Sequence, residues 1–598
     1  MAWYHEAVFY HIYPLGLFGA PKENDYGAPV HRLRDASGWI SHIRQIGCNA
    51  LYIGPLFESV GHGYETTDYR KLDSRLGDNE DLKEFVRECH AQDIRVVFDG
   101  VFNHVGRDFF AFQDLKANRE RSACRDWFCN VNFGGNNEYN DGFCYDNWGG
   151  YNLLVKLNQR NPAVRDYICD VIRFWVQEFD VDGIRLDAAD VLDFDFMKAL
   201  RGVANEVKPD FWLMGEVIHG DYTRWVNDGT LHAVTNYHLH KALYSGHNDH
   251  NYFEIAHTVK RLYDMGGSRP DGLRLYNFVD NHDVERIYTK LNNKAHFTPV
   301  HVLLYTLPGV PSVYYGSEFG IEGKKERFSD ASLRPALKYE DYQDACTDNS
   351  FTKLIAALGH IRQRTPALSY GSYRELLLTN RQYAFARELE GQSVIVTVNN
   401  DESPADLCVA AGDAPAYVGA LSGTRLLIEN GQLHVALAAS SGDIWLPEAG
   451  QDVNPTTGQE PIVLHVEDAA GSAAETVAAP KMPPAPQTAG DAAQVPAQNP
   501  GEDAPETPHR TTAPQTRQKA PSDGETPTAA PAAQTPTDSA APENDAVRAA
   551  FEQGKIAGLQ EAILAIMEKN GPVTDQMRKD VTDNVYHDSL VNWVKSFR

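Results

Sequence analysis

Short apolar segments alternate with amphipathic segments over residues 1–370, and this alternation restricts the possible folds more than any other feature. Helical patterns, for example over 161–179 and 251–265, separate the apolar segments. Eight of those segments are predicted to be strands: 7–13, 50–53, 95–98, 183–186, 211–214, 233–236, 273–279 and 312–315. This order favours an α/β fold, a (β/α)₈ TIM barrel, over an open doubly wound sheet. We prefer the barrel because polar residues follow several strands, where barrel enzymes carry their chemistry.

The remaining sequence divides by composition. The connection 105–152, after the third strand, has little helical period and is predicted to be an excursion or a small extra domain within the unit 1–370. Residues 371–447 alternate as strands do and predict a C-terminal antiparallel β domain. Residues 448–543 are rich in Pro, Ala and Thr and predict a disordered linker. Residues 544–598 predict a small helical tail for docking a protein partner or for self-association.

Charge and hydropathy restrict the partners of the chain. A formal net charge of -27 argues against nucleic acid and anionic membranes as partners. The first residues show no signal peptide, and no apolar run is long enough to span a membrane. We therefore expect a cytoplasmic protein whose eight cysteines are free thiols and whose ligand is neutral.

The fourth predicted strand carries a charged pair at its end. Arg185 and Asp187 are two residues apart, so on a strand both side chains point to the same face. A carboxylate beside a fixed guanidinium stays ionised at neutral pH, which a nucleophile requires. A simple salt bridge at the strand end explains this pair equally well.

Two further strands end in acids. Glu216 ends an apolar strand, where partial desolvation raises a carboxyl pKa and suits a general acid. Asp283 closes the polar run 280–283 after the seventh strand. A charged residue at a helix start explains Glu216 alone more simply, and a helix N-cap explains Asp283.

The third strand is followed by Asp99, Asn103 and His104, from which we expect a hydrogen bond of His104 to a substrate. A metal site would need more oxygen ligands than this segment offers. Polar clusters thus follow strands three, four, five and seven. Three unpaired acids at one mouth repel and are hard to explain as structure alone. Two carboxylates about 5 Å apart, by contrast, can cleave a glycosidic bond with retention.

Aromatic residues near the predicted mouth offer flat faces for sugar rings. Tyr64, Trp148 and Tyr315 are the candidates. Core packing is the alternative explanation, and we expect it to hold for most aromatic residues of this chain.

The four polar segments, together and in this order, resemble the signature regions of the α-amylase family, family 13 of the glycoside hydrolases. The matching segments are 99–104, 183–190, 215–217 and 278–283. The resemblance covers residues 1–447 and includes the β domain that follows the barrel in that family. It implies a retaining glycoside hydrolase that cleaves α-1,4-glucosidic bonds in maltodextrins or related α-glucan oligosaccharides.

The resemblance also implies catalytic roles. Asp187 resembles the nucleophile that forms the covalent glycosyl intermediate. Glu216 resembles the acid/base, and Asp283 resembles the third acid, which stabilises the transition state. Arg185 resembles the arginine that orients the nucleophile.

Further residues match substrate-binding positions of the family. His104 and His282 resemble the histidines that bind the sugar at the cleavage site. His62 and Tyr64 belong to a segment that resembles the one whose tyrosine stacks under that sugar. In many relatives the asparagine matching Asn103 helps to bind calcium with an acid from the B domain, to which residues 105–152 correspond by this resemblance. The spacing here singles out no such acid, so we assign no cofactor and no metal ligand, and calcium stays open.

The segment 153–158 ends in Lys-Leu-Asn and is similar to the fifth region of the neopullulanase and cyclomaltodextrinase branch. Members of that branch usually carry an N-terminal domain that supports a dimer. The first strand here begins near residue 7, so we expect that domain to be missing. We therefore favour a cytosolic amylase that cleaves maltodextrins.

Three alternatives stay open at this point. The first is a glycosyl transferase of the same family, which would use the same carboxylates. The second is a cyclomaltodextrinase or an α-glucosidase. The third is a non-catalytic carbohydrate-binding or assembly protein, which is disfavoured because Asp187, Glu216 and Asp283 are all present.

Overall fold

The computed structural model describes residues 2–266, 272–326 and 329–448. The predicted linker beyond residue 448 and the predicted helical tail, 544–598, lie outside the described residues. Within the described part, no helix is both long enough and apolar enough to cross a membrane.

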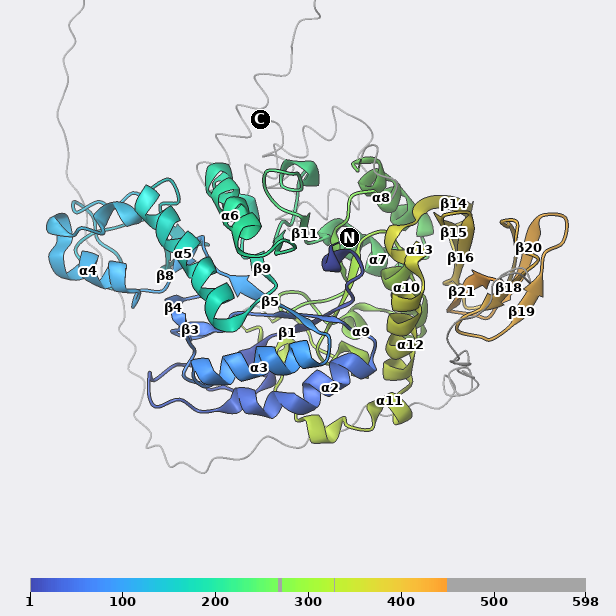
Figure 1. Cartoon of the computed structure of the whole chain (residues 1–598), viewed down its shortest axis with the longest axis horizontal. Helices are drawn as coiled ribbons and strands as arrows, with labels where there is room; N and C mark the ends of the chain where they lie inside the picture. The colour runs from blue at the N-terminus through green and yellow to red at the C-terminus, as the bar shows by residue number, and fades with distance from the viewer. Residues whose placement is uncertain (1, 267–271, 327–328, 449–598) are drawn as a thin grey trace, which may run out of the picture. The chain divides into compact units, whose positions relative to one another are not determined.

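Eight parallel strands form a closed barrel (Figure 1). In sequence order they are β1 (Phe9–Ile12), β2 (Ala50–Ile53), β5 (Arg95–Gly100), β9 (Gly183–Leu186), β10 (Trp212–Gly215), β11 (Ala233–Val234), β12 (Tyr276–Phe278) and β13 (Val310–Tyr314). The ladder runs from β11 to β12, and a parallel bridge between Thr235 and Tyr276 joins these two end strands. The predicted barrel and all eight predicted strands are therefore confirmed.

The strand period of two divides the side chains between two layers. Ile184 and Leu186 of β9 pack in the outer layer, between the strands and the helices. Phe9, Tyr52 and Trp212 belong to a second apolar cluster, which fills the barrel interior. Arg185 lies between Ile184 and Leu186 on β9, so its side chain points to the barrel axis.

Helices cover the outside of the barrel (Figure 1). They are α2 (Ser37–Gln45), α3 (Asn79–Ala91), α5 (Pro162–Phe179), α6 (Phe194–Val207), α7 (Tyr237–Asn248), α8 (Tyr252–Asp264), α10 (Phe297–Thr306) and α12 (Ser350–Arg364). The sequence patterns over 161–179 and 251–265 thus predicted α5 and α8 to within one residue. Asn161 caps α5 by accepting from the Ala163 N–H, and Pro162 occupies the first turn, where no N–H is needed.

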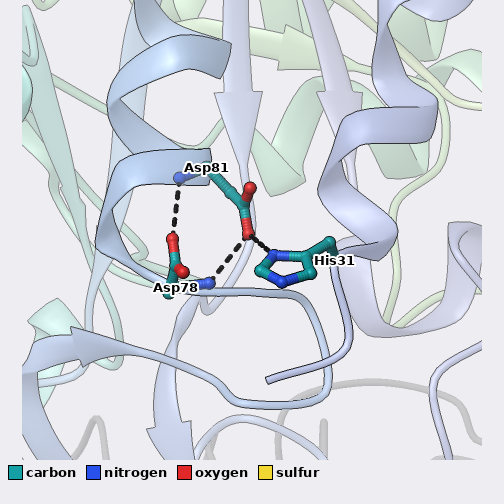
Figure 2. Close-up of side chains that lie close together, drawn as sticks. All are labelled: His31, Asp78 and Asp81. Carbon is teal, nitrogen blue, oxygen red and sulfur yellow. Dashed lines mark hydrogen bonds and ion pairs between the residues drawn. The ribbon is translucent and has the colours of Figure 1, made fainter. Parts of the chain in front are cut away.

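Helix α3 begins with a capping box that gathers three ionisable side chains (Figure 2). Asp78 accepts from the Asp81 N–H, and Asp81 accepts from the Asp78 N–H at 3.0 Å. Asp81 also contacts His31 Nδ1 and lies 2.5 Å from Arg34 Nε. The spacing of His31, Asp78 and Asp81 is compatible with a metal ion. Because helix N–H groups and these two basic side chains already engage the carboxylates, we explain the group as a helix cap.

The insertion after β5 has its own small sheet. Strands β6 (His104–Val105), β8 (Tyr151–Lys156) and β7 (Asn147–Trp148) pair in the order β6-β8-β7 and accompany helix α4 (Phe110–Asn118). Phe112 of α4 packs edge-on against Phe128 and Tyr145 of the same insertion. This sheet joins His104 to the inserted segment and places Trp148 beside it.

The segment after the barrel is antiparallel, as predicted. It runs from β14 (Ser372–Leu378) to β21 (Ser441–Pro447) and forms a six-stranded sheet, with a separate ribbon of β17 (Ala405–Ala410) and β20 (Gln432–Leu437). Barrel helix α10 packs against β16 (Gln392–Asn399) and β21.

His42 and Glu318 form a buried ion pair next to Tyr10 of β1. The Tyr10 hydroxyl donates to Glu318 Oε1 at 2.5 Å, and His42 Nε2 lies 3.0 Å from the same oxygen. Burial alone lowers the pKa of His42, but its contacts with Cys346 and Glu318 and the charge of Glu318 raise that pKa to about 9. The folded protein therefore binds the His42 proton more tightly than the unfolded chain does.

This pair predicts a pH-dependent stability. The contribution of protonated His42 is fully present below its unfolded pKa of 6.5 and is lost as the pH rises through about 9. We expect the free energy of unfolding, measured by urea denaturation, to fall across this interval by an amount on the order of 3 kcal/mol. Glu318→Gln should remove most of that slope, whereas His257→Gln, at an exposed site on α8, should keep it. Equal slopes in all three proteins would contradict the assignment.

Candidate active site

Four barrel strands bring acidic side chains to one end of the barrel. Asp99 lies near the end of β5, and Asp187 follows β9 directly. Glu216 follows β10, and Asp283 lies five residues after the end of β12. All four therefore lie at or beyond the carboxyl ends of parallel strands, which form one face of a barrel.

Arg185 is the centre of this group. Its Nη1 donates to Asp99 Oδ1 at 2.9 Å and to Asp187 Oδ1 at 2.8 Å, and its Nη2 lies 2.8 Å from Glu216 Oε2. Asp99 is the register partner of Arg185 on the neighbouring strand, so the sheet itself aligns the two side chains. The Arg185 side chain is only 3% exposed. One buried guanidinium thus holds three carboxylates in fixed positions.

The pKa of Asp187 differs from the sequence-based expectation that Arg185 keeps this carboxylate ionised. Burial raises the pKa of Asp187 well above its usual range, and the charges of Glu216 and Asp99 add to this effect although Arg185 opposes it. The difference arises mainly because Asp187 is buried, and also because other carboxylates share its one guanidinium. Two neighbouring carboxyl groups, one as nucleophile and one as acid/base, are what retaining hydrolysis needs.

Glu216 is held by two further contacts. Its Oε2 accepts from the Ala188 N–H at 3.1 Å, and the Tyr237 hydroxyl lies 3.4 Å from its Oε1. Ala188 has a φ of 46°, a left-handed conformation that is rare for a residue with a side chain. This local strain turns the N–H that follows Asp187 toward Glu216.

Asp283 is fixed by a histidine and an arginine. His282 Nε2 lies 3.1 Å from its Oδ2, and Arg334 Nη2 donates to its Oδ1 at 2.9 Å. Arg334 Nε also donates to the His282 carbonyl at 3.0 Å. Burial alone raises the pKa of Asp283, but His282 and Arg334 outweigh burial and hold that pKa well below its usual range. Asp283 is therefore ionised at neutral pH.

Tyr64 connects the two groups. Its hydroxyl lies 2.5 Å from His282 Nε2 and donates to Asp99 Oδ2 at 3.2 Å. The Tyr64 and His282 rings are nearly parallel, with centroids 5.6 Å apart. A continuous set of polar contacts thus runs from Asp283 through His282, Tyr64 and Asp99 to Arg185.

The remaining predicted binding residues lie around this network. His62 Nε2 is 3.1 Å from Glu65 Oε1, and the His62 side chain is about half exposed. His104 is buried, and its ring is parallel to that of Trp148 at 6.3 Å. Burial lowers the pKa of His104 to about 3, so its imidazole is neutral and has one N–H to donate.

Sequence reasoning misplaced one aromatic residue and missed three polar ones. Tyr315 is fully buried and its hydroxyl donates to the Pro335 carbonyl, so its ring offers no face to a sugar. Arg334, Tyr237 and Asn281 were missed although they hold Asp283 and Glu216. The sequence signal that could have indicated Arg334 is its position in the loop that follows the last barrel strand.

The residues around Asn103 do not fit a calcium site. Asn103 Oδ1 accepts from Gln159 Nε2 at 3.3 Å, and its backbone carbonyl accepts from the Leu157 N–H at 3.0 Å. Gln159 Oε1 in turn accepts from the Asp193 N–H. Protein N–H groups therefore already occupy the oxygens that a calcium ion would use.

Comparison with known proteins agrees with this geometry. The family model "Alpha amylase, catalytic domain" matches residues 35–369, and the chain therefore belongs to the α-amylase family of glycoside hydrolases. A protein named cyclomaltodextrinase from Thermoanaerobacter pseudethanolicus is 31% identical over 431 residues, which cover 67% of this chain and 71% of that protein. The name agrees with the branch that the Lys-Leu-Asn segment indicated.

Two other relatives extend the comparison. A protein named intracellular maltogenic amylase from Bacillus subtilis is 28% identical over 386 residues, 63% of each chain. The crystal structure of a debranching enzyme from Nostoc punctiforme superposes with a TM-score of 0.62 at 27% identity and covers 74% of this chain and 98% of that one. The relatives thus resemble this chain in sequence, and the solved structure resembles it in fold, although their names differ in the glucan they indicate.

Proposed function

We propose that this protein hydrolyses α-1,4-glucosidic bonds in maltodextrins or related α-glucans and retains the configuration at the anomeric carbon. The observation that carries the proposal is that Arg185 binds Asp187 and Glu216 through its two terminal nitrogens at 2.8 Å each. That arrangement holds two carboxyl groups close together, so that they can flank the scissile bond as retaining glycosidases require.

The geometry supports a two-step mechanism. In the first step, Glu216 gives its proton to the glycosidic oxygen while Asp187 attacks the anomeric carbon, so a covalent glycosyl ester forms and the leaving sugar departs. In the second step, Glu216 takes a proton from water and the resulting hydroxide displaces Asp187. Both residues return to their starting protonation states.

The surrounding side chains fit binding roles. Asp283 is ionised and is positioned by His282 and Arg334, so it suits both stabilisation of the developing positive charge and hydrogen bonding to sugar hydroxyls. The Tyr64 ring suits stacking against a sugar face. His62, His104 and His282 supply hydrogen bonds to the same sugar.

The proposal extends to the organisation of the chain. We assign residues 1–370 to the catalytic unit, with the B domain at 105–152, and residues 371–447 to the β domain. The name of the Bacillus subtilis relative, intracellular maltogenic amylase, supports a cytoplasmic location. We further assign to the tail, 544–598, a docking or self-association role.

The products of maltoheptaose, β-cyclodextrin and pullulan test the proposal. We expect the full chain to release short maltooligosaccharides that carry the α configuration when first formed, as proton NMR of the anomeric hydrogens can show. Cellohexaose, which has β linkages, is the control and should stay intact. Initial β-anomeric products would contradict retention, and the absence of cleavage in all three α-glucans would overturn the substrate class.

A further inference from the structure

A cavity opens at the opposite end of the barrel from the carboxylates. Its volume is about 350 Å³, within the range of small-molecule sites. Its lining includes Trp212, Ala233 and Val310, which are the first residues of β10, β11 and β13. The cavity therefore lies at the amino ends of the barrel strands, whereas the carboxylates of the candidate active site lie at the carboxyl ends.

Two arginines line this cavity. Arg201 comes from α6, and Arg274 precedes β12. Arg201 Nη1 donates to the Thr230 carbonyl at 2.9 Å and its Nε donates to Asn205 Oδ1 at 3.2 Å. These contacts fix the direction of the guanidinium and leave its Nη2 for a ligand. A positioned guanidinium is the preferred protein partner of phosphate and carboxylate groups.

Neutral donors complete the lining. His232 Nδ1 accepts from the Leu213 N–H at 2.9 Å. Burial, Arg201 and His5 lower the pKa of His232 to about 3, so the ring is neutral and its one proton is on Nε2. Tyr4 also lines the cavity: burial and, to a smaller extent, Asp210 raise the pKa of its hydroxyl, while Arg201 and Arg274 oppose that rise. The cavity thus presents mostly hydrogen-bond donors.

More positive charge lies directly behind Arg274. Arg362 is fully buried and donates to the Tyr305 and Gly309 carbonyls at 2.6 and 2.5 Å. Burial together with the charges of Arg387 and Arg274 lowers the pKa of Arg362 to about 9. Like charges of this kind raise the positive potential at the cavity and favour an anion there. Among the described lining residues, Asp228 is the one carboxylate; it is exposed, and its charge acts on Arg201.

One wall of the cavity is aromatic. The Tyr4 ring stacks on Trp212 at 6.1 Å and lies 5.1 Å from the His232 ring. A ligand that carries both an anionic group and a flat apolar face would use both kinds of wall.

We propose that the cavity lined by Tyr4, Arg201, His232 and Arg274 binds a phosphate group, either free or carried by a sugar. This site is separate from the carboxylates that cleave glucan, and no step of the proposed hydrolysis uses it.

Isothermal titration of the full chain at low ionic strength tests this site with inorganic phosphate, glucose 6-phosphate and maltose. We expect the two phosphates to bind saturably and Arg201→Gln to weaken their binding about tenfold, because one charge-assisted hydrogen bond is lost. Lys198→Gln is the matched control, since Lys198 lies on the same helix and pairs with Asp195. Its affinity for phosphate should equal that of the unchanged protein. The far-ultraviolet circular dichroism spectrum of Arg201→Gln should match that of the wild type, which shows that the variant is folded.

The measured affinities distinguish a phosphorylated sugar from free phosphate, and they also test a neutral sugar as the alternative ligand. A lower Kd for glucose 6-phosphate than for inorganic phosphate assigns the site to phosphorylated sugars, and equal values assign it to free phosphate. Absence of saturable phosphate binding, or equal phosphate affinity in wild type and Arg201→Gln, would overturn the proposal. Maltose binding that depends on Arg201 would replace it with a neutral sugar site. Since binding is the readout, these results are independent of whether the glucan assignment holds.

Discussion

Replacing Asp187 with asparagine is expected to lower kcat/KM for maltoheptaose by about 10⁴-fold or more, the scale of effect seen when a catalytic nucleophile is removed. The amide keeps the shape of the side chain, so Arg185 retains a hydrogen-bond acceptor at the distance of 2.8 Å seen in the structure. It lacks the negative charge that attacks the anomeric carbon. Binding of maltoheptaose should persist, which titration calorimetry with the inactive variant can measure.

A matched substitution controls for unspecific damage. Asp195→Asn makes the same change on exposed helix α6, where the side chain pairs with Lys198, and should leave kcat/KM unchanged. Asp187→Asn should also fail to form the covalent ester that a slowly released fluoro-sugar substrate leaves on the wild-type protein, as intact-protein mass spectrometry can detect. An Asp187→Asn variant that keeps a tenth of the activity would show that another group is the nucleophile.

The barrel was predictable because its signals are local. Each strand is a short apolar run, and α5 and α8 have clear helical periods, so their positions followed from the sequence to within one to three residues. The pairing of Arg185 with Asp187 across one strand face followed from the period of two. By the same period Ile184 and Leu186 point to the opposite face, and the structure has them in the outer layer.

Long-range contacts of the site were not predictable in this way. Arg334 reaches Asp283 across 51 residues, and Tyr237 reaches Glu216 across 21. Such contacts depend on which loops meet above the barrel, and periodicity carries no information about that. The sequence also did not reveal that Arg185 binds Asp99 as well as Asp187. Arg185 and Asp99 are 86 positions apart in the chain and meet only through the register of neighbouring strands. The burial of Tyr315 likewise depends on the loop that carries Pro335.

Replacing Glu216 with glutamine is expected to affect the two steps of the reaction differently. Hydrolysis of maltoheptaose should fall by about 10²- to 10⁴-fold, because the leaving oxygen no longer receives a proton. Cleavage of α-glucosyl fluoride should fall far less in its first step, because fluoride departs without protonation. Glutamine keeps an oxygen that accepts from the Ala188 N–H, so the position of the side chain is preserved.

The second step gives the sharper test of Glu216. Without a base, water attacks the glycosyl ester slowly, and the ester should accumulate on Asp187. Azide needs no base, so added azide should restore turnover of α-glucosyl fluoride and yield α-glucosyl azide. Glu206→Gln, at an exposed residue that pairs with Arg173 on the outside of the barrel, should behave as wild type in every assay. If Glu216→Gln lost activity equally on maltoheptaose and on α-glucosyl fluoride, and azide rescued neither, Glu216 would be a positioning residue and the acid would have to be sought elsewhere at the same mouth.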